Sequence, residues 1–167
     1  MFQRVLLAVA LQNWEVPTPY ALAAREVAMQ LAKGASHPLY VLTVYRDEEP
    51  PRVQPLLVAP EEVEASERLL SAEEAALRTA LEAKLRDYVQ AMEQVGIAVV
   101  PLIRAGSPRD TVVRVAEEIR ADCIVIGSHS KRHVFDLGGT AQAICKAAPA
   151  TVVMASPAQR GVAGAAG

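Results

Sequence analysis

The residues whose types and spacing could most clearly bind a ligand or do chemistry lie between Gly127 and Thr140. An apolar segment ends at Gly127, a polar and cationic run occupies 128–133, and Gly138-Gly139-Thr140 precede a short helical segment. A strand, a glycine-containing loop and a helix start together present unpaired backbone N–H groups, which suit an anion such as a phosphate. The alternative is a solvated loop with a glycine hinge and a threonine helix cap.

No arrangement typical of catalysis accompanies this stretch. The sequence contains no GxxxxGK[ST] loop, no GxSxG elbow and no HExxH motif. Ser128, His129 and Ser130 are neighbours, but no Asp or Glu is obviously placed to orient the imidazole, and Asp136 is interpreted as a solvated loop acid. His129 and His133 lack the Cys, Asp or Glu partners that a closed metal site needs. We therefore expect no catalytic residue, no enzyme activity and no bound metal.

The composition limits the kind of protein that positions this stretch. With 167 residues, 51% of them hydrophobic, the chain can form one domain with a proper core. The net charge of −2 gives no electrostatic reason to expect nucleic acid or a membrane surface as partner. No secretory signal is recognisable at the start, and we expect Cys123 and Cys145 to be small core residues in a cytoplasmic protein.

Apolar runs and helical patterns alternate along the chain. This alternation predicts an α/β fold: a single-domain, three-layer α/β/α structure whose parallel sheet is covered on both faces. Ligands of such folds bind beyond the carboxyl ends of the strands, where the strand order switches, so the loops after the first and fourth strands form the candidate site. The expected strands are 4–10, 39–45, 97–104, 122–127 and 151–155, and the expected helices begin at Pro19, Glu61, Pro108 and Ala141.

The last expected strand bears on the partners of the protein. Thr151–Ala155 ends the fold, carries no charge and contains no proline, so it should form an open edge of the sheet. Such an edge invites pairing with a second chain, and we expect a homodimer through it. The Ala/Gly-rich residues 157–167 show no periodicity and are expected to form a disordered tail after a domain of residues 1–156.

Several motifs together resemble the universal stress protein family. They are the run ADCIVIGSH at 121–129, the later GT at 139–140, the motif APATVVM at 148–154, and AGSP at 105–108 before a helix. The resemblance covers roughly residues 3–156. It implies a five-stranded sheet of order 3-2-1-4-5 and frequent dimers in which the last strands of two subunits pair.

The resemblance also implies an altered nucleotide site. Nucleotide-binding members carry a glycine, two residues, a second glycine, nine residues, and then glycine with Ser or Thr, besides an Asp at the end of the first strand. In this chain Ser130 replaces the second glycine, eight residues separate it from Gly139, and Ala10 stands at the Asp position. The resemblance implies that four residues hold ATP or AMP. Val44 would contact the adenine, and the others are Gly127, Gly139 and Thr140.

Three functions remain open on the sequence alone. The first is a non-enzymatic, homodimeric stress-response or regulatory module with an unidentified protein client and a degraded nucleotide loop. The second is an adenine-nucleotide switch of the same family, and the third is an enzyme that hydrolyses or transfers nucleotides. Trp14, in the loop after the first strand, either stacks on a base or anchors that loop.

Overall fold

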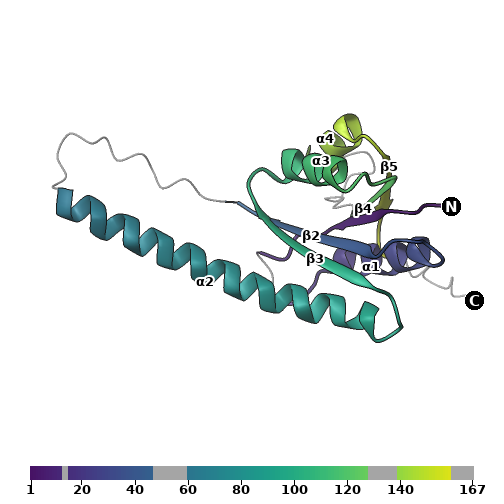
Figure 1. Cartoon of the computed structure of the whole chain (residues 1–167), viewed down its shortest axis with the longest axis horizontal. Helices are drawn as coiled ribbons and strands as arrows, with labels where there is room; N and C mark the ends of the chain where they lie inside the picture. Colours follow the sequence, from purple (N-terminus) through teal and green to yellow (C-terminus); the bar gives the residue numbers. More distant parts are fainter. Residues whose placement is uncertain (13–14, 47–59, 128–138, 159–167) are drawn as a thin grey trace, which may run out of the picture.

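The protein is described by a computed structural model over residues 1–12, 15–46, 60–127 and 139–158. Within these ranges strands and helices alternate as the sequence predicts, with ends that differ by a few residues (Figure 1). Residues 159–167 of the expected tail lie outside the described residues. The elements are β1 (Val5–Ala8), α1 (Pro19–Ala32), β2 (Leu39–Tyr45), α2 (Pro60–Glu93), β3 (Val99–Ala105), α3 (Pro108–Glu118), β4 (Cys123–Gly127), α4 (Gly139–Ala147) and β5 (Thr151–Ala155).

The strands form one parallel sheet of order β3-β2-β1-β4-β5, which confirms the predicted α/β/α architecture. Helices α1 and α2 cover one face, and α3 and α4 cover the other (Figure 1). In the central strand β1, Leu7 joins the core under α1 and α2, whereas Leu6 joins the core under α3 and α4. Pro101 lies on β3, which is an edge strand. Proline has no N–H to donate to a neighbouring strand, and on the outer side of an edge strand there is no neighbour to receive one.

Helix starts follow the sequence signals only in part. Thr18 caps α1, because its side chain accepts a hydrogen bond from the backbone N–H of Ala21 at 3.2 Å. The sequence also predicts that Ser107 caps α3. Ser107 does occupy the cap position, but its hydroxyl makes no capping hydrogen bond, so this part of the prediction is wrong. Gly34 and Gly96 follow α1 and α2 with φ of +79° and +84°, a conformation that favours glycine.

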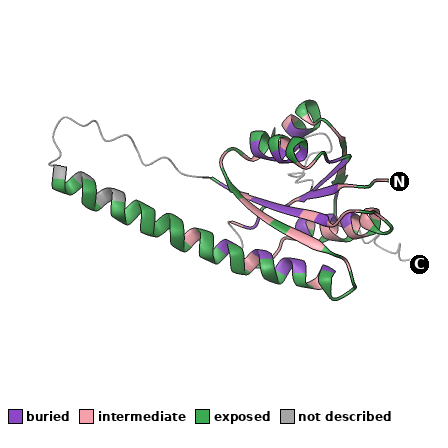
Figure 2. Cartoon of the chain, in the orientation of Figure 1, coloured by how far each residue is buried: buried purple, intermediate pink, exposed green. Residues whose placement is uncertain are grey.

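Helix α2 packs on the sheet over its C-terminal half and projects from the body over its N-terminal half (Figures 1 and 2). The sequence predicts one apolar stripe along α2 and just beyond it. The middle of that stripe is buried, but Leu70 near one end is 40% exposed and Val95 at the other is 67% exposed. The helix is therefore longer than the sheet that it covers. The buried side chains of α2 are Leu81, Leu85, Tyr88, Val89 and Met92.

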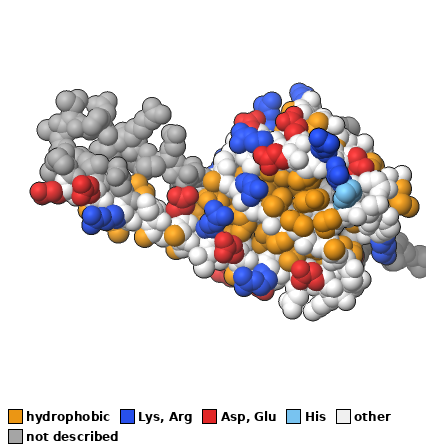
Figure 3. All heavy atoms as spheres, in the orientation of Figure 1, with side chains coloured by type: hydrophobic (Ala, Val, Ile, Leu, Met, Phe, Trp, Pro, Cys, Tyr) orange, Lys and Arg blue, Asp and Glu red, His pale blue; other side chains and the backbone are white. Residues whose placement is uncertain are grey.

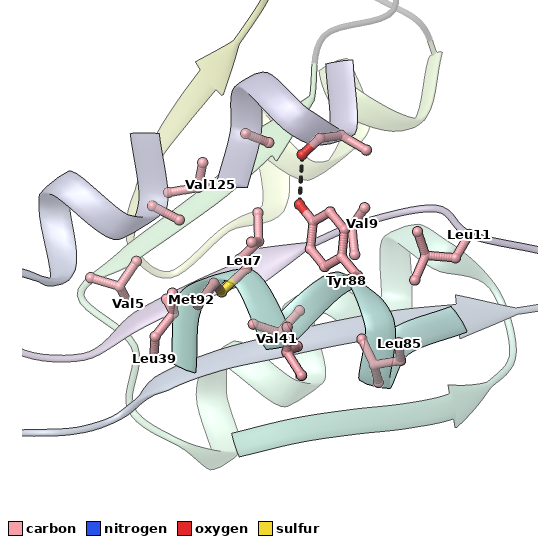
Figure 4. Packing of buried hydrophobic residues seen from close by; sticks show 14 of the residues in the cluster. Val5, Leu7, Val9, Leu11, Leu39, Val41, Leu85, Tyr88, Met92 and Val125 are labelled. Atoms are coloured by element: carbon pink, nitrogen blue, oxygen red, sulfur yellow. Dashed lines mark hydrogen bonds between the residues drawn. The ribbon is translucent and has the colours of Figure 1, made fainter. Parts of the chain in front are cut away.

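Tyr88 joins α2 to α1 through the core. Its hydroxyl donates a 2.6 Å hydrogen bond to the carbonyl of Ala21, drawn in Figure 4. The guanidinium carbon of Arg25 lies 5.2 Å from the Tyr88 ring centroid, and its Nη1 donates to the Tyr88 carbonyl at 3.2 Å. Burial raises the pKa of Tyr88 well above its usual value, so this hydroxyl stays a hydrogen-bond donor at physiological pH.

The two cysteines occupy different environments. Cys123 lies fully buried in β4, and burial raises the pKa of its thiol to about 11, which makes it a poor nucleophile at neutral pH. Cys145 is exposed on α4, so the expectation of a core position is wrong for this residue. Its neighbour Ile144 points into the core instead, and adjacent helical positions cannot share a face.

A buried hydroxyl in β2 gives a test of the core. Thr43 is fully buried, and among the described residues its Oγ1 has no hydrogen-bond partner. A buried polar group without a partner costs about 1–3 kcal/mol. We expect Thr43→Val, which has the same shape, to raise the free energy of unfolding by about 1–2 kcal/mol in urea denaturation.

Thr43→Ser is the matched control for this substitution. It keeps the hydroxyl and removes only the methyl group, and we expect it to lower the free energy of unfolding by about 1 kcal/mol. A Thr43→Val protein that is less stable than the parent would show that the hydroxyl has a partner that stabilises it.

Candidate functional site

A cavity of about 290 Å³ opens at the carboxyl edge of the sheet. It is lined by residues at the carboxyl ends of β1, β2 and β4 and by the first turns of α1, α3 and α4. Strands β1 and β4 are neighbours whose connections run to opposite sides of the sheet, so the cavity lies at the switch in strand order. This is where the fold class places its ligands.

All the residues predicted for the site line this one cavity, although they come from distant parts of the sequence. Val44 belongs to β2, Gly127 ends β4, and Gly139 and Thr140 begin α4. Their role in holding a ligand stays a prediction. Ala10, at the position where the family's nucleotide-binding members carry Asp, also lines the cavity. Other residues considered from the sequence, Trp14, Ser128, His129, Ser130 and His133, lie outside the described residues.

The walls of the cavity are mostly apolar. Val44, Ile126 and Ile144 line it from the sheet and from α4, together with Leu42 and Val112. Among the described lining residues none carries a charged side chain, and the polar side chains are the hydroxyl-bearing Thr18, Tyr20 and Thr140. Such a lining favours a flat apolar group over a strongly polar one.

Helix starts give the cavity its electrostatic character. The first turns of α1, α3 and α4 all contribute lining residues, and helix N-termini carry partial positive charge and unpaired N–H groups. Helices α1 and α3 begin with proline, which removes one N–H from each first turn. Helix α4 begins with Gly139 and Thr140, which are both exposed and both keep their backbone N–H groups.

The structure separates the roles of two glycines that look alike in the sequence. A Cβ at Gly127 would lie 3.2 Å from both the Cβ and the carbonyl oxygen of Tyr20, so this glycine lets the start of α1 approach β4. A Cβ at Gly139 would meet no described atom within 4 Å. Gly127 is thus a packing glycine at the base of the cavity, whereas Gly139 leaves space at the start of α4.

Thr18 and Tyr20 also line the cavity, although the sequence did not predict them as site residues. The sequence predicts Thr18 as a helix cap and Tyr20 as part of an apolar helix face, and both roles are compatible with lining the cavity. A signal was present in the chain order, because the helix after the first strand of a doubly wound sheet begins at the ligand edge.

Two other kinds of site receive no support in the described part of the chain. The described residues contain no group of three or more His, Cys, Asp or Glu side chains that could hold a metal ion. Over the same residues, no helix combines the length and the apolar character that crossing a bilayer demands.

The sequence was compared with models of known protein families. The model of the universal stress protein family matches residues 1–156. The chain belongs to the universal stress protein family. A search of curated proteins finds no match.

Solved structures share the universal stress protein fold with this chain at low sequence identity. A protein named MJ0577 has a TM-score of 0.68 at 19% identity, covering 93% of this chain and 96% of its own. The universal stress protein of Archaeoglobus fulgidus, in complex with dAMP, has a TM-score of 0.60 at 18% identity, covering 92% and 98%. A family member from Arabidopsis thaliana with AMP bound has a TM-score of 0.58 at 18% identity, covering 92% and 91%.

The packing role of Gly127 in this universal stress protein is testable by adding one methyl group. Because the added Cβ would press on the backbone of α1, we expect Gly127→Ala to lower the free energy of unfolding by about 1–3 kcal/mol. Urea denaturation without ligand measures this cost. Gly139→Ala is the matched control, and we expect its stability to stay within about 1 kcal/mol of the parent or to rise. Equal stability of Gly127→Ala and the parent would contradict the packing role.

Proposed function

We propose that this universal stress protein is a cytoplasmic, homodimeric regulatory module that binds an adenine nucleotide such as AMP or ATP without turning it over. The observation that carries the proposal is the cavity, which combines apolar walls with the starts of three helices. A nucleotide has the matching parts, a flat base and an anionic phosphate. Relatives of the same fold bound to dAMP and to AMP support this choice of ligand.

The lining suggests how the two parts of the ligand divide the cavity. The base packs against Val44 and the apolar walls, and the phosphate lies at the start of α4, near Gly139 and Thr140. Ala10 supplies no carboxylate to accept hydrogen bonds from the ribose or the base. Binding then depends on apolar contact and backbone N–H groups, so we expect an affinity in the micromolar range or weaker.

The same lining supports a binding role over a catalytic one. Turnover of a phosphate ester or anhydride needs a group that moves a proton, or a bound metal ion. Among the described lining residues the side-chain polar groups are hydroxyls, with no carboxylate, imidazole or amine to act as a general base. The function proposed here therefore ends with binding and with its effect on a protein partner.

Strand β5 supports the homodimer. It forms the outer edge of the sheet, and its five residues carry no charge. Met154 is 39% exposed on this edge, and the outer N–H and C=O groups of an edge strand are available to a second copy. Pairing of β5 with its symmetry mate would extend the sheet across two subunits.

Nucleotide binding is tested by titration calorimetry with AMP, ADP and ATP on the parent and on Gly139→Val. We expect micromolar binding to the parent and loss of binding in the variant, because branched bulk at the start of α4 fills the space next to the phosphate position. A Cβ at this position would meet no described atom within 4 Å in the ligand-free chain, so we expect the fold to survive. Circular dichroism checks that it does.

Two outcomes would contradict this prediction. Unchanged affinity in Gly139→Val would remove the start of α4 from the site, and no heat with any of the three nucleotides would reject nucleotide binding altogether. Release of inorganic phosphate from ATP with added Mg²⁺ would instead favour the enzymatic alternative.

The homodimer is tested by placing a charge on the open edge. We expect the parent to scatter light as a dimer at micromolar concentration and Met154→Lys to scatter as a monomer, because a lysine ammonium opposes edge-to-edge pairing. Val95→Lys is the matched control, since Val95 is also an exposed apolar residue but lies beyond α2. A parent that is monomeric, or a Met154→Lys protein that stays dimeric, would refute pairing through β5.

A further inference from the structure

Two walls of the cavity are formed by residues that lie beyond the last hydrogen bond between β1 and β2. Pairing between β1 and β2 reaches Ala8 opposite Leu42, and one more bond joins the Val9 N–H to the Leu42 carbonyl at 2.9 Å. Beyond this point lie Ala10, which follows β1, and Val44, near the end of β2, and both line the cavity. Contacts other than the ladder between these two strands must therefore fix the separation of the two walls.

Two side chains connect α2, the chain after β1 and the chain after β2. The Nζ of Lys84, on α2, donates to the carbonyl oxygens of Leu11 and Gln12 at 3.3 and 3.4 Å. The Oε1 of Gln12 in turn accepts a hydrogen bond from the backbone N–H of Arg46 at 3.1 Å. Gln12 lies two residues after Ala10 and Arg46 two residues after Val44, so these bonds tie both walls to α2.

Packing holds this bridge in place. Leu11 is 3% exposed and belongs to the same buried cluster as Leu81 and Leu85, which lie on either side of Lys84 along α2 (Figure 4 draws Leu11 and Leu85). The apolar contacts fix the backbone of residues 11 and 12 against α2. The half-buried Lys84 then supplies donors to two carbonyls that have left the sheet ladder.

We propose that Lys84 and Gln12 are positioning residues that set the width of the cavity between Ala10 and Val44. Neither lines the cavity, so they act through the backbone that carries its walls. An apolar slot for a flat base depends on this width, because contact energy falls steeply when a gap opens between packed atoms. The effect on a nucleotide rests on the proposed function, whereas the positioning itself is a property of the ligand-free chain.

The test compares Lys84→Met, Lys84→Arg and Gln12→Met in two measurements. Methionine keeps the unbranched apolar stem but loses the donors, and arginine restores the charge and the donors. We expect amide hydrogen exchange at Arg46 in the ligand-free protein to accelerate about tenfold in both methionine variants and to stay near the parental rate in Lys84→Arg. The Kd for AMP should rise about tenfold in the same two variants and return toward the parental value in Lys84→Arg.

Arg86→Met is the matched control, because Arg86 is exposed two residues along the same helix. It should change neither measurement. Parental exchange at Arg46 in both methionine variants would overturn the proposal, and so would an equal loss of affinity in Lys84→Met and Arg86→Met. Faster exchange that is rescued by Lys84→Arg, in a protein that binds no AMP even as the parent, would support the positioning and reject nucleotide binding.

Discussion

A parallel sheet buried on both faces constrains everything else in this protein. Each connection must bring the chain back to the amino edge of the sheet, so a helix that follows a strand directly begins at the carboxyl edge. Helices α1, α3 and α4, which follow β1, β3 and β4, all begin at that edge. Their unpaired N–H groups and the apolar ends of the strands meet there, and the cavity is the result.

Helix α2 departs from this rule, and its departure has structural consequences. Residues 47–59 separate it from β2, and it contributes no described residue to the lining of the cavity. Its C-terminal half instead covers the sheet, where Tyr88 bonds to α1 and Lys84 bonds to the chain after β1. Its N-terminal half projects beyond the sheet, which is why Leu70 continues the apolar periodicity but stays partly exposed (Figure 2).

Most of the fold could be predicted from the sequence, because a strand that is buried on both faces consists of an uninterrupted run of apolar residues. Uninterrupted apolar runs marked the strands, and Thr18 with Pro19 marked the start of α1. The predicted site positions lie at the carboxyl ends of strands or begin a helix, so the topology alone brings them to one cavity. Helical periodicity cannot show how far a sheet extends beneath a helix, and for that reason the exposure of Leu70 was not predictable.

Gly127 shows a second limit of the sequence. A glycine that admits a phosphate and a glycine that admits a neighbouring helix have the same side chain and the same place in the strand-loop order. Only the 3.2 Å approach of Tyr20 distinguishes them. This assignment also changes what the family motif means here, because the first glycine is explained by packing whether or not a phosphate is bound.

The origin of the positive potential decides how the site can be altered. Among the described lining residues no side chain carries charge, so the proposed attraction for an anion rests on backbone N–H groups, which substitutions other than proline leave in place. What substitution can change is access to those groups and the spacing of the walls. A larger side chain at Gly139 would reduce access to the backbone N–H groups. Loss of the contacts of Lys84 and Gln12 would change the spacing of the walls.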